Sequence, residues 1–559
     1  MGKFRWQIII VFVALMAIGL LLIGQQPSLL PETAPQIQPT TGGVYSEALI
    51  GSAGRFNPVL DFHNPADQSV DRLLFSSLVV FDSRGLPVGD LAETWGISQD
   101  GKVYNFSLRA NAKWHDGTPV TSADILFTID LLRNEQLPIA SDLRDFWSQI
   151  EVRELDEKTL QLRLPEPFAP FMDYLTFGIL PRHILGGLSV DEIIASPFNL
   201  KPVGSGPFQF SHLLVENGQI KGVVLTAFQD YYQKVPFVEQ VVFRYYPDAQ
   251  ASLEAYQAQD VLGISQVTPS ILDAVLKDDN LNLYTGRLPR LSLIYLNLND
   301  PRLPFFQSAA LRRALASGLN RQKIVDRILG GQAIIAHSPI LSDSWAYYDA
   351  VEKLEYDPEG ATEAFRKAEY TVPPEGTYIR AKQGVALSFE LVYPQEETYQ
   401  AIAEMIRGDW QKLGVEVKLK GLDYGELISD YLEPRAYQAA LVDINQMRSP
   451  DPDPYPFWHQ SMAANGQNYS MWDDRLASEY LEQARVEVDL ESRMRRYRNF
   501  QVRFVTEMPA IPLYFHVYSY AVDAQVQGIR VGPFFDPADR LNTIASWYLI
   551  AKRATPTPG

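Results

Sequence analysis

Short apolar or alternating runs recur between amphipathic segments along most of the chain. GVVLTAF (222–228), QVVFRYY (240–246), LSLIYLNL (291–298) and VEVKLKGL (415–422) are rich in β-branched and aromatic residues, which favours strands. Such runs intermix with helical patterns throughout residues 44–550, and no repeat of 20–50 residues is visible. The pattern predicts an α/β protein with mixed sheets and argues against solenoids and propellers.

Helical periodicity is clearest in three segments. Thr121 stands three positions before Asp124, as in a capping box, and opens one predicted helix. Segment 308–329 repeats leucine at i, i+4 spacing and predicts a second helix. Segment 491–508 predicts a third, which ends before Pro509; the residues expected on its inner face are Tyr497, Phe500, Phe504 and Val505.

The first residues have the pattern of an export signal. Lys3 and Arg5 precede an apolar run over residues 8–24, with no clean small-residue cleavage motif after it. We interpret residues 1–24 as a signal that stays in place as a membrane anchor, with cleavage as the alternative. We interpret residues 25–41, which are rich in Pro, Thr and Gln, as a semi-extended tether between the anchor and the body of the protein. Either way, the body of the protein is predicted to be extracytoplasmic, periplasmic or on the cell surface.

Composition narrows the function classes. The formal net charge of −18 argues against a nucleic-acid partner, which needs clustered Lys and Arg. The absence of cysteine from the sequence excludes disulfides, thiolate catalysis and iron–sulfur clusters. A hydrophobic content of 46% is ample for several packed cores in a chain of this length.

Catalytic and metal-binding motifs are nearly absent. The sequence from Gly96 to Val103 has the glycine and lysine spacing of a phosphate loop, but Val103 stands where Ser or Thr is needed and an alternating run follows. A hairpin turn at Asp100 and Gly101 explains it better. No two histidines lie within five positions of each other; they are His63, His115, His183, His212, His337, His459 and His516. We therefore predict a protein that is not an enzyme and holds no metal or cofactor, with an exported hydrolase assembled from distant residues as the alternative.

The stretch RSPDPDPYPFWH (448–459) stands out because proline occupies every second position from Pro450 to Pro456. Proline lacks a backbone donor and pushes the preceding residue out of the helical region. The pattern predicts a stiff, extended rod that presents Asp451, Asp453, Tyr455 and Trp458.

Six segments together resemble the family 5 extracytoplasmic solute-binding proteins, which deliver peptides, nickel chelates and some oligosaccharides to ABC importers. They are LAETWGISQDGKVYNFSLRANAKWHDGTPVTSADILFTIDLL (91–132), PVGSGPFQF (202–210), RRALASGLNRQKIVDRILGGQA (312–333), AEMIRGDWQKLGVEVKLKGLDYGELI (403–428), DPDPYPFWHQS with GQNYSMWDD (451–474) and FVTEMPAIPLYF (504–515). The resemblance spans essentially the whole chain after the tether.

The resemblance implies a type II periplasmic-binding-protein fold with two lobes, an extra domain and a ligand cleft between the lobes. Lobe I would comprise residues 42–85, 196–292 and 511–550, with the extra domain inserted at 86–195. Lobe II would comprise residues 293–510. Two crossing strands, near LSLIYLNL and PAIPLYF, would form the hinge.

The resemblance also suggests where a ligand would lie. The proline-rich rod would line the cleft in lobe II, so that Asp451 and Asp453 accept hydrogen bonds and Tyr455 or Trp458 offers a flat apolar surface. The alternative for each residue is inward packing or turn capping. Three further cleft candidates are Asn57, Asn468 and Tyr469.

Two anchors of the peptide-binding members are missing. Arg448 or Pro450 stands where an aspartate would hold a peptide's amino group; Asp443, Asp451 or Asp453 could substitute, but none matches the family's position. Tyr393 stands where dipeptide binders place an arginine for the carboxylate. Both anchors for a peptide's terminal charges are therefore unsupported. The resemblance implies a binding protein for an oligopeptide-like solute that works with an ABC permease, and we expect it to be a monomer. Oligosaccharide remains the alternative ligand, and a nickel chelate is the weaker one.

Overall fold

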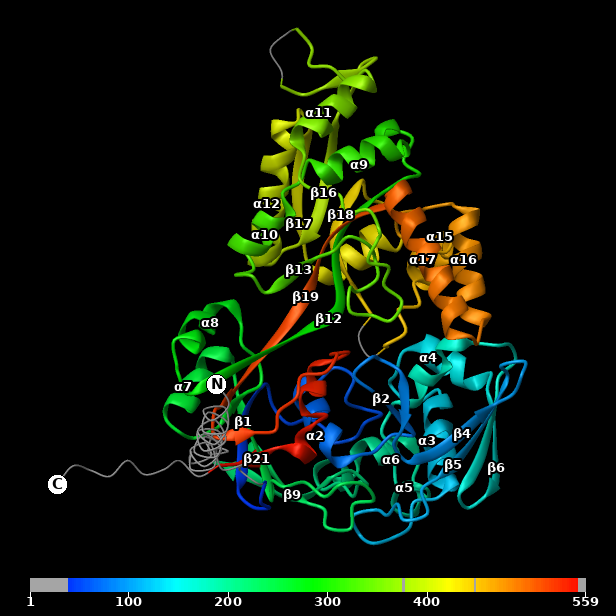
Figure 1. Ribbon diagram of the computed structural model, residues 1–559, viewed down its shortest axis with the longest axis vertical. Helices are drawn as coiled ribbons and strands as arrows, with labels where there is room; N and C mark the ends of the chain where they lie inside the picture. The colour runs from blue at the N-terminus through cyan, green and yellow to red at the C-terminus, as the bar shows by residue number, and fades with distance from the viewer. Residues whose placement is uncertain (1–38, 375–377, 447–448, 551–559) are drawn as a thin grey trace, which may run out of the picture. The chain divides into compact units, whose positions relative to one another are not determined.

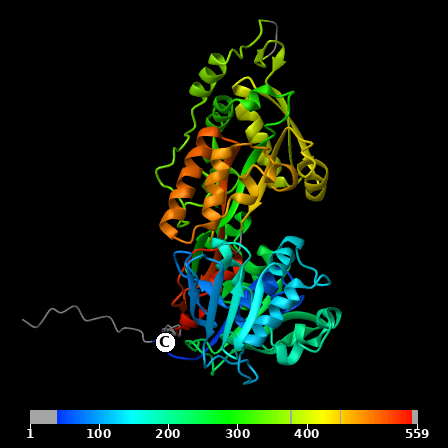
Figure 2. The ribbon, with the colours of Figure 1, turned by 90° about the vertical axis from the view of Figure 1, so that its right-hand side faces the viewer.

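The computed structural model describes residues 39–374, 378–446 and 449–550 (Figures 1 and 2). The chain divides into two units, residues 1–40 and 41–559, and the account below concerns the second. None of the helices in the described ranges has the length and apolarity needed to cross a membrane. The predicted signal or anchor segment, residues 1–24, lies outside the described residues.

A mixed sheet of eleven strands runs through the described part of the second unit. Its order is β17-β16-β18-β12-β19-β11-β1-β10-β9-β8, with β13 paired to β19. Strand β1 is parallel to β10 and β11, and β16 is parallel to β17 and β18, whereas the other pairs are antiparallel. The strands are β1 Val44–Ile50, β8 Phe208–Glu216, β9 Gln219–Ala227, β10 Gln240–Tyr246, β11 Gly263–Ile264, β12 Leu281–Leu296, β13 Ala333–Ile335, β16 Ser388–Pro394, β17 Glu416–Leu422, β18 Ala439–Asn445 and β19 Ala510–Asp523.

The apolar side chains gather in two large cores. The first core draws on residues 45–245 and 518–547, and the second on residues 291–515. A smaller cluster packs α7 (Ala249–Gln257) and α8 (Pro269–Leu276) on the sheet. The apolar residues of 86–195 belong to the first core and form no separate cluster.

Strands β12 and β19 pass from one core to the other side by side (Figure 1). Leu288 packs in the first core and Leu291 in the second; on β19, Phe515 packs in the second and Tyr518 in the first. The pairing slips between Arg287 and Leu291, where Pro289 lacks a backbone donor. Regular pairing is therefore interrupted at the point where the chain changes cores.

Residues 86–195 form a four-stranded antiparallel sheet, β4-β5-β7-β6, with helices beside it. The predicted hairpin at Asp100 and Gly101 is confirmed, because β4 pairs with β5 and Gly101 has a φ of +67°. The predicted capping box of Thr121 and Asp124 is also confirmed. The elements are β4 Ala92–Ile97, β5 Val103–Leu108, β6 Glu151–Asp156, β7 Thr159–Arg163, α3 Ser122–Arg133, α4 Ser141–Ser148, η1 Ala169–Leu175, α5 Arg182–Leu185 and α6 Val190–Ala195.

Of two long helices predicted from the sequence, one is confirmed and the other was wrong. Helix α17 confirms the third predicted helix, with Tyr497, Phe500, Phe504 and Val505 buried. The single helix predicted over 308–329 was wrong: α9 ends at Ser317, and the side chain of Asn320 caps α10 by accepting from the backbone of Lys323. Gly318 and Asn320 favour this break. Helices of this part are α9 Ala309–Ser317, α10 Arg321–Arg327, α11 Pro358–Lys367, α12 Glu397–Lys412, α14 Tyr455–Trp458, α15 Met462–Asn465, α16 Arg475–Val486 and α17 Leu490–Glu507.

Shorter elements complete the unit. They are α2 Pro65–Leu74, β2 Val79–Phe81, β3 Pro87–Gly89, η2 Pro197–Leu200, η3 Pro304–Gln307, β14 Ala381–Lys382, β15 Val385–Ala386, α13 Tyr424–Glu426, η4 Leu427–Leu432, β20 Val526–Gln527, η5 Pro537–Leu541, η6 Ile544–Ser546 and β21 Tyr548–Leu549.

Candidate functional site

A small cavity lies between the two cores, beside the crossing strands. It is lined from the first core by Phe534, from the second by Leu341 and Trp345, and from β12 by Arg287 and Pro289. Its volume is about 30 Å³, close to the space of a single water molecule. A larger, open hollow of about 430 Å³ lies over α8 and β20, away from this junction.

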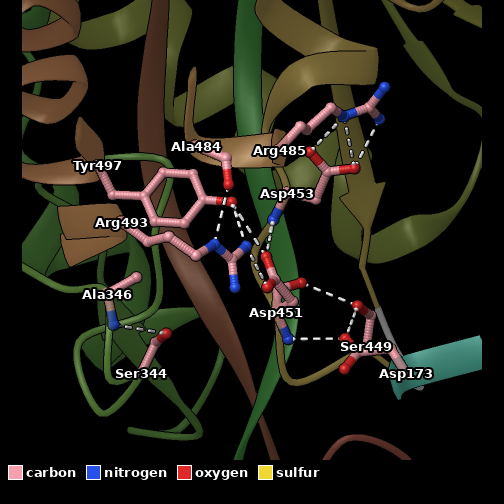
Figure 3. A network of polar contacts seen from close by, with 10 residues as sticks. All are labelled: Asp173, Ser344, Ala346, Ser449, Asp451, Asp453, Ala484, Arg485, Arg493 and Tyr497. Atoms are coloured by element: carbon pink, nitrogen blue, oxygen red, sulfur yellow. Dashed lines mark hydrogen bonds and ion pairs between the residues drawn. The ribbon is translucent and has the colours of Figure 1, made fainter. Parts of the chain in front are cut away.

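A polar network joins the two sides of this junction (Figure 3). Asp173 of η1, whose apolar neighbours belong to the first core, accepts hydrogen bonds from Ser449 Oγ at 2.5 Å and from the backbone of Asp451 at 2.8 Å. Asp451 in turn is ion-paired with Arg493 of α17 and accepts from Tyr497 Oη at 3.0 Å. Helix α16 also contacts η1. The network thus ties segment 169–175 to the proline-rich stretch.

Burial and the charge of Asp451 both disfavour ionisation of the Asp173 carboxyl group. Burial raises the pKa of Asp173 to about 8, and the neighbouring charge of Asp451 adds to the effect. Hydrogen bonds from Ser449 and Asp451 and the charge of Arg493 oppose it. Burial also raises the pKa of Asp451, although the charge of Arg493 works against that rise. Burial and the charge of Asp451 thus favour the protonated form of Asp173.

Asp453, the second predicted carboxylate of the rod, makes an ion pair of its own. Both of its oxygens accept from Arg485 of α16, at 2.6 to 3.1 Å. The Arg485 guanidinium also lies over the rings of Tyr455, at 3.9 Å, and Phe168, at 5.6 Å. Asp451 and Asp453 are thus both paired with arginine and fix the stretch in place.

The extended rod predicted for the whole stretch was wrong in its second half. Residues Tyr455–Trp458 form helix α14, with Pro454 at the cap and Pro456 in the first turn. Proline is tolerated there because first-turn backbone donors have no partner within the helix. Regular alternation of proline therefore did not distinguish an extended segment from the start of a helix.

The predicted aromatic residues of this region pack inward to different extents. Trp458 is buried among Tyr295 and Phe504 of the second core. Tyr455 is half-buried and stacks on His459 at 4.0 Å between ring centres. Tyr469 is half-buried, edge-on to Tyr295, with the Arg435 guanidinium 5.0 Å from its ring centre. Only Tyr455 and Tyr469 keep exposed surface for a ligand.

The remaining amide and tyrosine candidates are held inside the protein. Asn57 is fully buried and bonds to the Asn199 side chain at 3.0 Å. Asn468 is fully buried and bridges backbone groups of His459 and Trp472. Tyr393 is the second-last residue of β16, is 7% exposed and packs on Gly421. In this structure all three hold local packing together.

Replacing Asn468 by alanine is expected to destabilise the protein by about 1–3 kcal/mol, because buried backbone groups lose their partners. The measurement is a urea titration followed by tryptophan fluorescence. Asn465→Ala, at an exposed position of the same segment, serves as the control, with a change within about 0.5 kcal/mol. Equal effects of the two substitutions would show that the buried amide does not stabilise the segment.

Asp443 of β18 is the centre of a second polar cluster. Its oxygens accept from Arg290 Nε at 2.6 Å, Ser292 Oγ at 2.5 Å and Tyr399 Oη at 2.7 Å, and His516 Nε2 lies at 3.0 Å. Burial alone would raise the pKa of Asp443, but the hydrogen bond and charge of His516, and then Arg290, hold it well below its usual range. The Asp443 carboxylate is thus ionised, held in place by these hydrogen bonds, and has its negative charge balanced by its partners.

Several of these functional candidates were missed from the sequence. No local sequence pattern pointed to Asp173, Arg290 or Arg493, because each of them is bonded to a partner more than forty positions away. No group of three or more His, Asp or Glu residues that could hold a metal occurs among the described residues. The structure pairs Asp451 and Asp453 with arginines that the sequence did not indicate. The side chains of Asn57, Asn468 and Trp458 have other partners.

Comparisons with known proteins agree with this architecture. Residues 87–467 match the family described as bacterial extracellular solute-binding proteins, family 5 middle. The oligopeptide-binding protein AppA of Bacillus subtilis is 26% identical over 523 residues, covering 92% of each chain. Its structure with a nonapeptide has a TM-score of 0.68 at 24% identity and covers 92% of this chain and 100% of AppA.

A structure with a different ligand is similar to the same degree. NikZ of Campylobacter jejuni, in complex with Ni(L-His), has a TM-score of 0.68 at 24% identity, covering 90% of this chain and 99% of NikZ. These likenesses bear out the predicted α/β periplasmic-binding-protein fold with mixed sheets. They do not separate one ligand class from another.

Proposed function

The chain belongs to the family 5 bacterial extracellular solute-binding proteins, and on that premise we propose that it closes on an oligopeptide-like solute between its two cores. Such proteins are the non-enzymatic binding components of ABC transporters. The observation that carries the proposal is the crossing of β12 and β19 between two separate cores, with a cavity lined by both. The solute would then pass to a permease.

Closure here means the approach of the two cores about the crossing strands. Strands β12 and β19 are the long elements shared by both cores, and their pairing is irregular at Pro289. A few residues with irregular pairing can absorb a change of backbone angle. We propose lobe I at residues 42–85, 196–292 and 511–550, an inserted domain at 86–195 and lobe II at 293–510, with the hinge where Leu288 gives way to Leu291.

Membrane attachment belongs to the same proposal. The apolar run of residues 8–24 would hold the protein at the membrane, and residues 25–41 would let the body reach a permease. The monomeric state fits a protein whose closure brings two parts of one chain together.

The peptide assignment is tested by thermal unfolding with peptides of two to ten residues. A ligand at a hundred times its dissociation constant adds about 2.7 kcal/mol to the stability of the native state, which raises the melting temperature by several degrees. Oligosaccharides and nickel–histidine form the two comparison arms. A shift in either of these arms and none with peptides would contradict the peptide assignment while leaving solute binding intact.

A further inference from the structure

We propose that the tail of the sequence, residues 551–559 (AKRATPTPG), adds as a further strand to one edge of β12. The edge belongs to residues 281–287, before β12 crosses to the second core. It carries unpaired backbone groups, runs beside the open hollow over α8 and β20, and lies close to Ile550, after which the tail begins. Binding of a solute plays no part in this contact.

Within the described part of the chain, β12 is paired on one side only over residues 281–287. Strand β19 pairs with these residues, whereas β18 pairs with β12 on the other side from Arg290 onward. Backbone groups of an antiparallel strand point to its two sides in alternation. The next step is to find which residues of β12 point to the open side.

The bonds of β19 identify these residues. The Asp523 N–H donates to the Leu262 carbonyl at 2.8 Å, away from β12, and Asp523 is paired with Leu281. By alternation, the N–H and C=O groups of Leu283 and Thr285 also point away from β19. Across this edge, the described residues offer neither of them a hydrogen-bond partner. Such an edge is a template for a further strand.

The hollow of about 430 Å³ follows this edge. One wall is formed by four consecutive residues of β12, 281–284, and the other by residues 526–529. Because side chains of a strand alternate between its two faces, a hollow that touches four in a row lies along the edge. Leu276 also lines the hollow and is 63% exposed. A segment lying in the hollow would cover this leucine.

The tail begins beside the same hollow. The Ile550 N–H donates to the Gln525 carbonyl at 2.9 Å, and the preceding residue Leu549 is paired with Val526, which lines the hollow. The nine residues of the tail span about 30 Å when extended. Residues 281–287 of β12 span roughly 20 Å. The tail is therefore long enough to lie along the whole edge.

The sequence of the tail is compatible with an edge strand. Pro556 and Pro558 are two positions apart, so in an extended strand both nitrogens, which carry no hydrogen, point to the same side. With that side toward solvent, the N–H groups of Thr555 and Thr557 point to β12. Threonine also favours strands.

Charges at the start of the edge are complementary to those of the tail. Lys552 and Arg553 are the only charged residues of the tail, whereas Asp278 and Asp279 precede β12. Lys277 is the one cation beside these two aspartates in the sequence. The Ala524 N–H donates to the Asn280 carbonyl at 2.7 Å, which brings the segment next to Ile550 close to this acidic turn.

Hydrogen exchange of the full chain tests the contact. An added strand protects the amides of Leu283 and Thr285, so removal of residues 551–559 should speed their exchange about tenfold or more. Thr557→Pro gives three successive prolines and should have the same effect, because in any register a nitrogen without hydrogen then faces β12. Thr557→Val keeps the N–H and is the matched control, with exchange as in the wild type.

Disulfide formation identifies what occupies the hollow. The sequence has no cysteine, so Leu276→Cys combined with Thr557→Cys gives a unique pair. A disulfide requires Cα atoms within about 7 Å of each other, and mild oxidation should join the two within one chain. The control replaces Leu276→Cys by Val215→Cys, at a position of β8 that is 57% exposed, and should give no disulfide within the chain.

The outcomes separate the possible occupants. Equal exchange with and without residues 551–559 would overturn the proposal, and so would wild-type exchange in Thr557→Pro. Disulfides that form only between chains would assign the edge to a second copy and overturn it as well. Equal yields with Leu276→Cys and Val215→Cys would show that the tail approaches the surface without a specific site. None of these readouts needs a solute, so their failure leaves the proposed solute binding untouched.

Discussion

Replacing Asp173 by asparagine is expected to remove most of the pH dependence of solute binding and to tighten binding at pH 7.5. Asp173 bridges the two sides of the junction through Ser449 and Asp451, and burial raises its pKa to about 8. Asparagine resembles the protonated acid and keeps an oxygen that can accept both bonds. The measurement is the dissociation constant by calorimetry from pH 5 to pH 8.5.

The sign follows from linkage between proton binding and closure. The pKa of Asp173 is raised in this structure, where the junction is formed, above the ordinary value of about 3.9 that an exposed aspartate would have if the two sides separated. The favourable contribution to closure is then complete in acid and is lost as the pH rises toward 8. Wild-type affinity should therefore fall as the pH rises through neutrality toward 8, and level off above pH 8.

Charged side chains near Asp173 affect its pKa and therefore the pH dependence of binding. Asp451 and Asp453 follow β18, Arg485 lies on α16 and Arg493 on α17. The matched control is Asp142→Asn, which changes an exposed carboxylate on α4 and should keep the wild-type profile. A dissociation constant that does not change with pH in the wild type, or that changes equally in Asp173→Asn, would contradict the conclusion that Asp173 binds a proton at the junction.

The second large effect is expected on stability. Arg493→Met should lower the free energy of unfolding by about 3–5 kcal/mol, because it leaves the carboxylate of Asp451 buried without its counter-charge. The Arg493 and Asp451 side chains are 7% and 6% exposed. Urea unfolding at pH 7, followed by tryptophan fluorescence, measures the change.

Two further variants sharpen this prediction. Arg495→Met, at an exposed position two residues along α17, should change stability by less than about 0.5 kcal/mol. The double substitution Asp451→Asn with Arg493→Met should recover most of the loss, since no buried charge then remains. Equal losses in Arg493→Met and Arg495→Met would show that the ion pair does not stabilise the stretch.

The sequence was most informative where structure is decided locally. The apolar spacing of 491–508 identified α17, and the turn chemistry of Asp100 and Gly101 identified the β4–β5 hairpin. The wrong predictions arose where two local sequence signals conflicted. Leucine spacing continued across Gly318 and Asn320, although these residues end one helix and cap the next. The prolines before Trp458 fitted both an extended segment and a helix start.

The site was less predictable because its contacts join distant residues. Asp451 and Asp453 were singled out because neighbouring prolines restrict the backbone, but their partners Arg493 and Arg485 follow only from the packing of α16 and α17. The contact between Asp173 and Asp451 spans 278 positions. Asp443 was considered as an amine anchor, and only its neighbours Arg290 and His516 show that its charge is already neutralised.

The central claim, closure of two cores about β12 and β19, is tested most directly by distance. The natural sequence has no cysteine, so Val215→Cys and Tyr424→Cys, at exposed positions beside the first and second cores, give two unique labelling sites. Single-molecule energy transfer between the labels should shift to a shorter distance when a solute that binds by calorimetry is added. An unchanged distribution at saturating solute would contradict closure about the crossing strands.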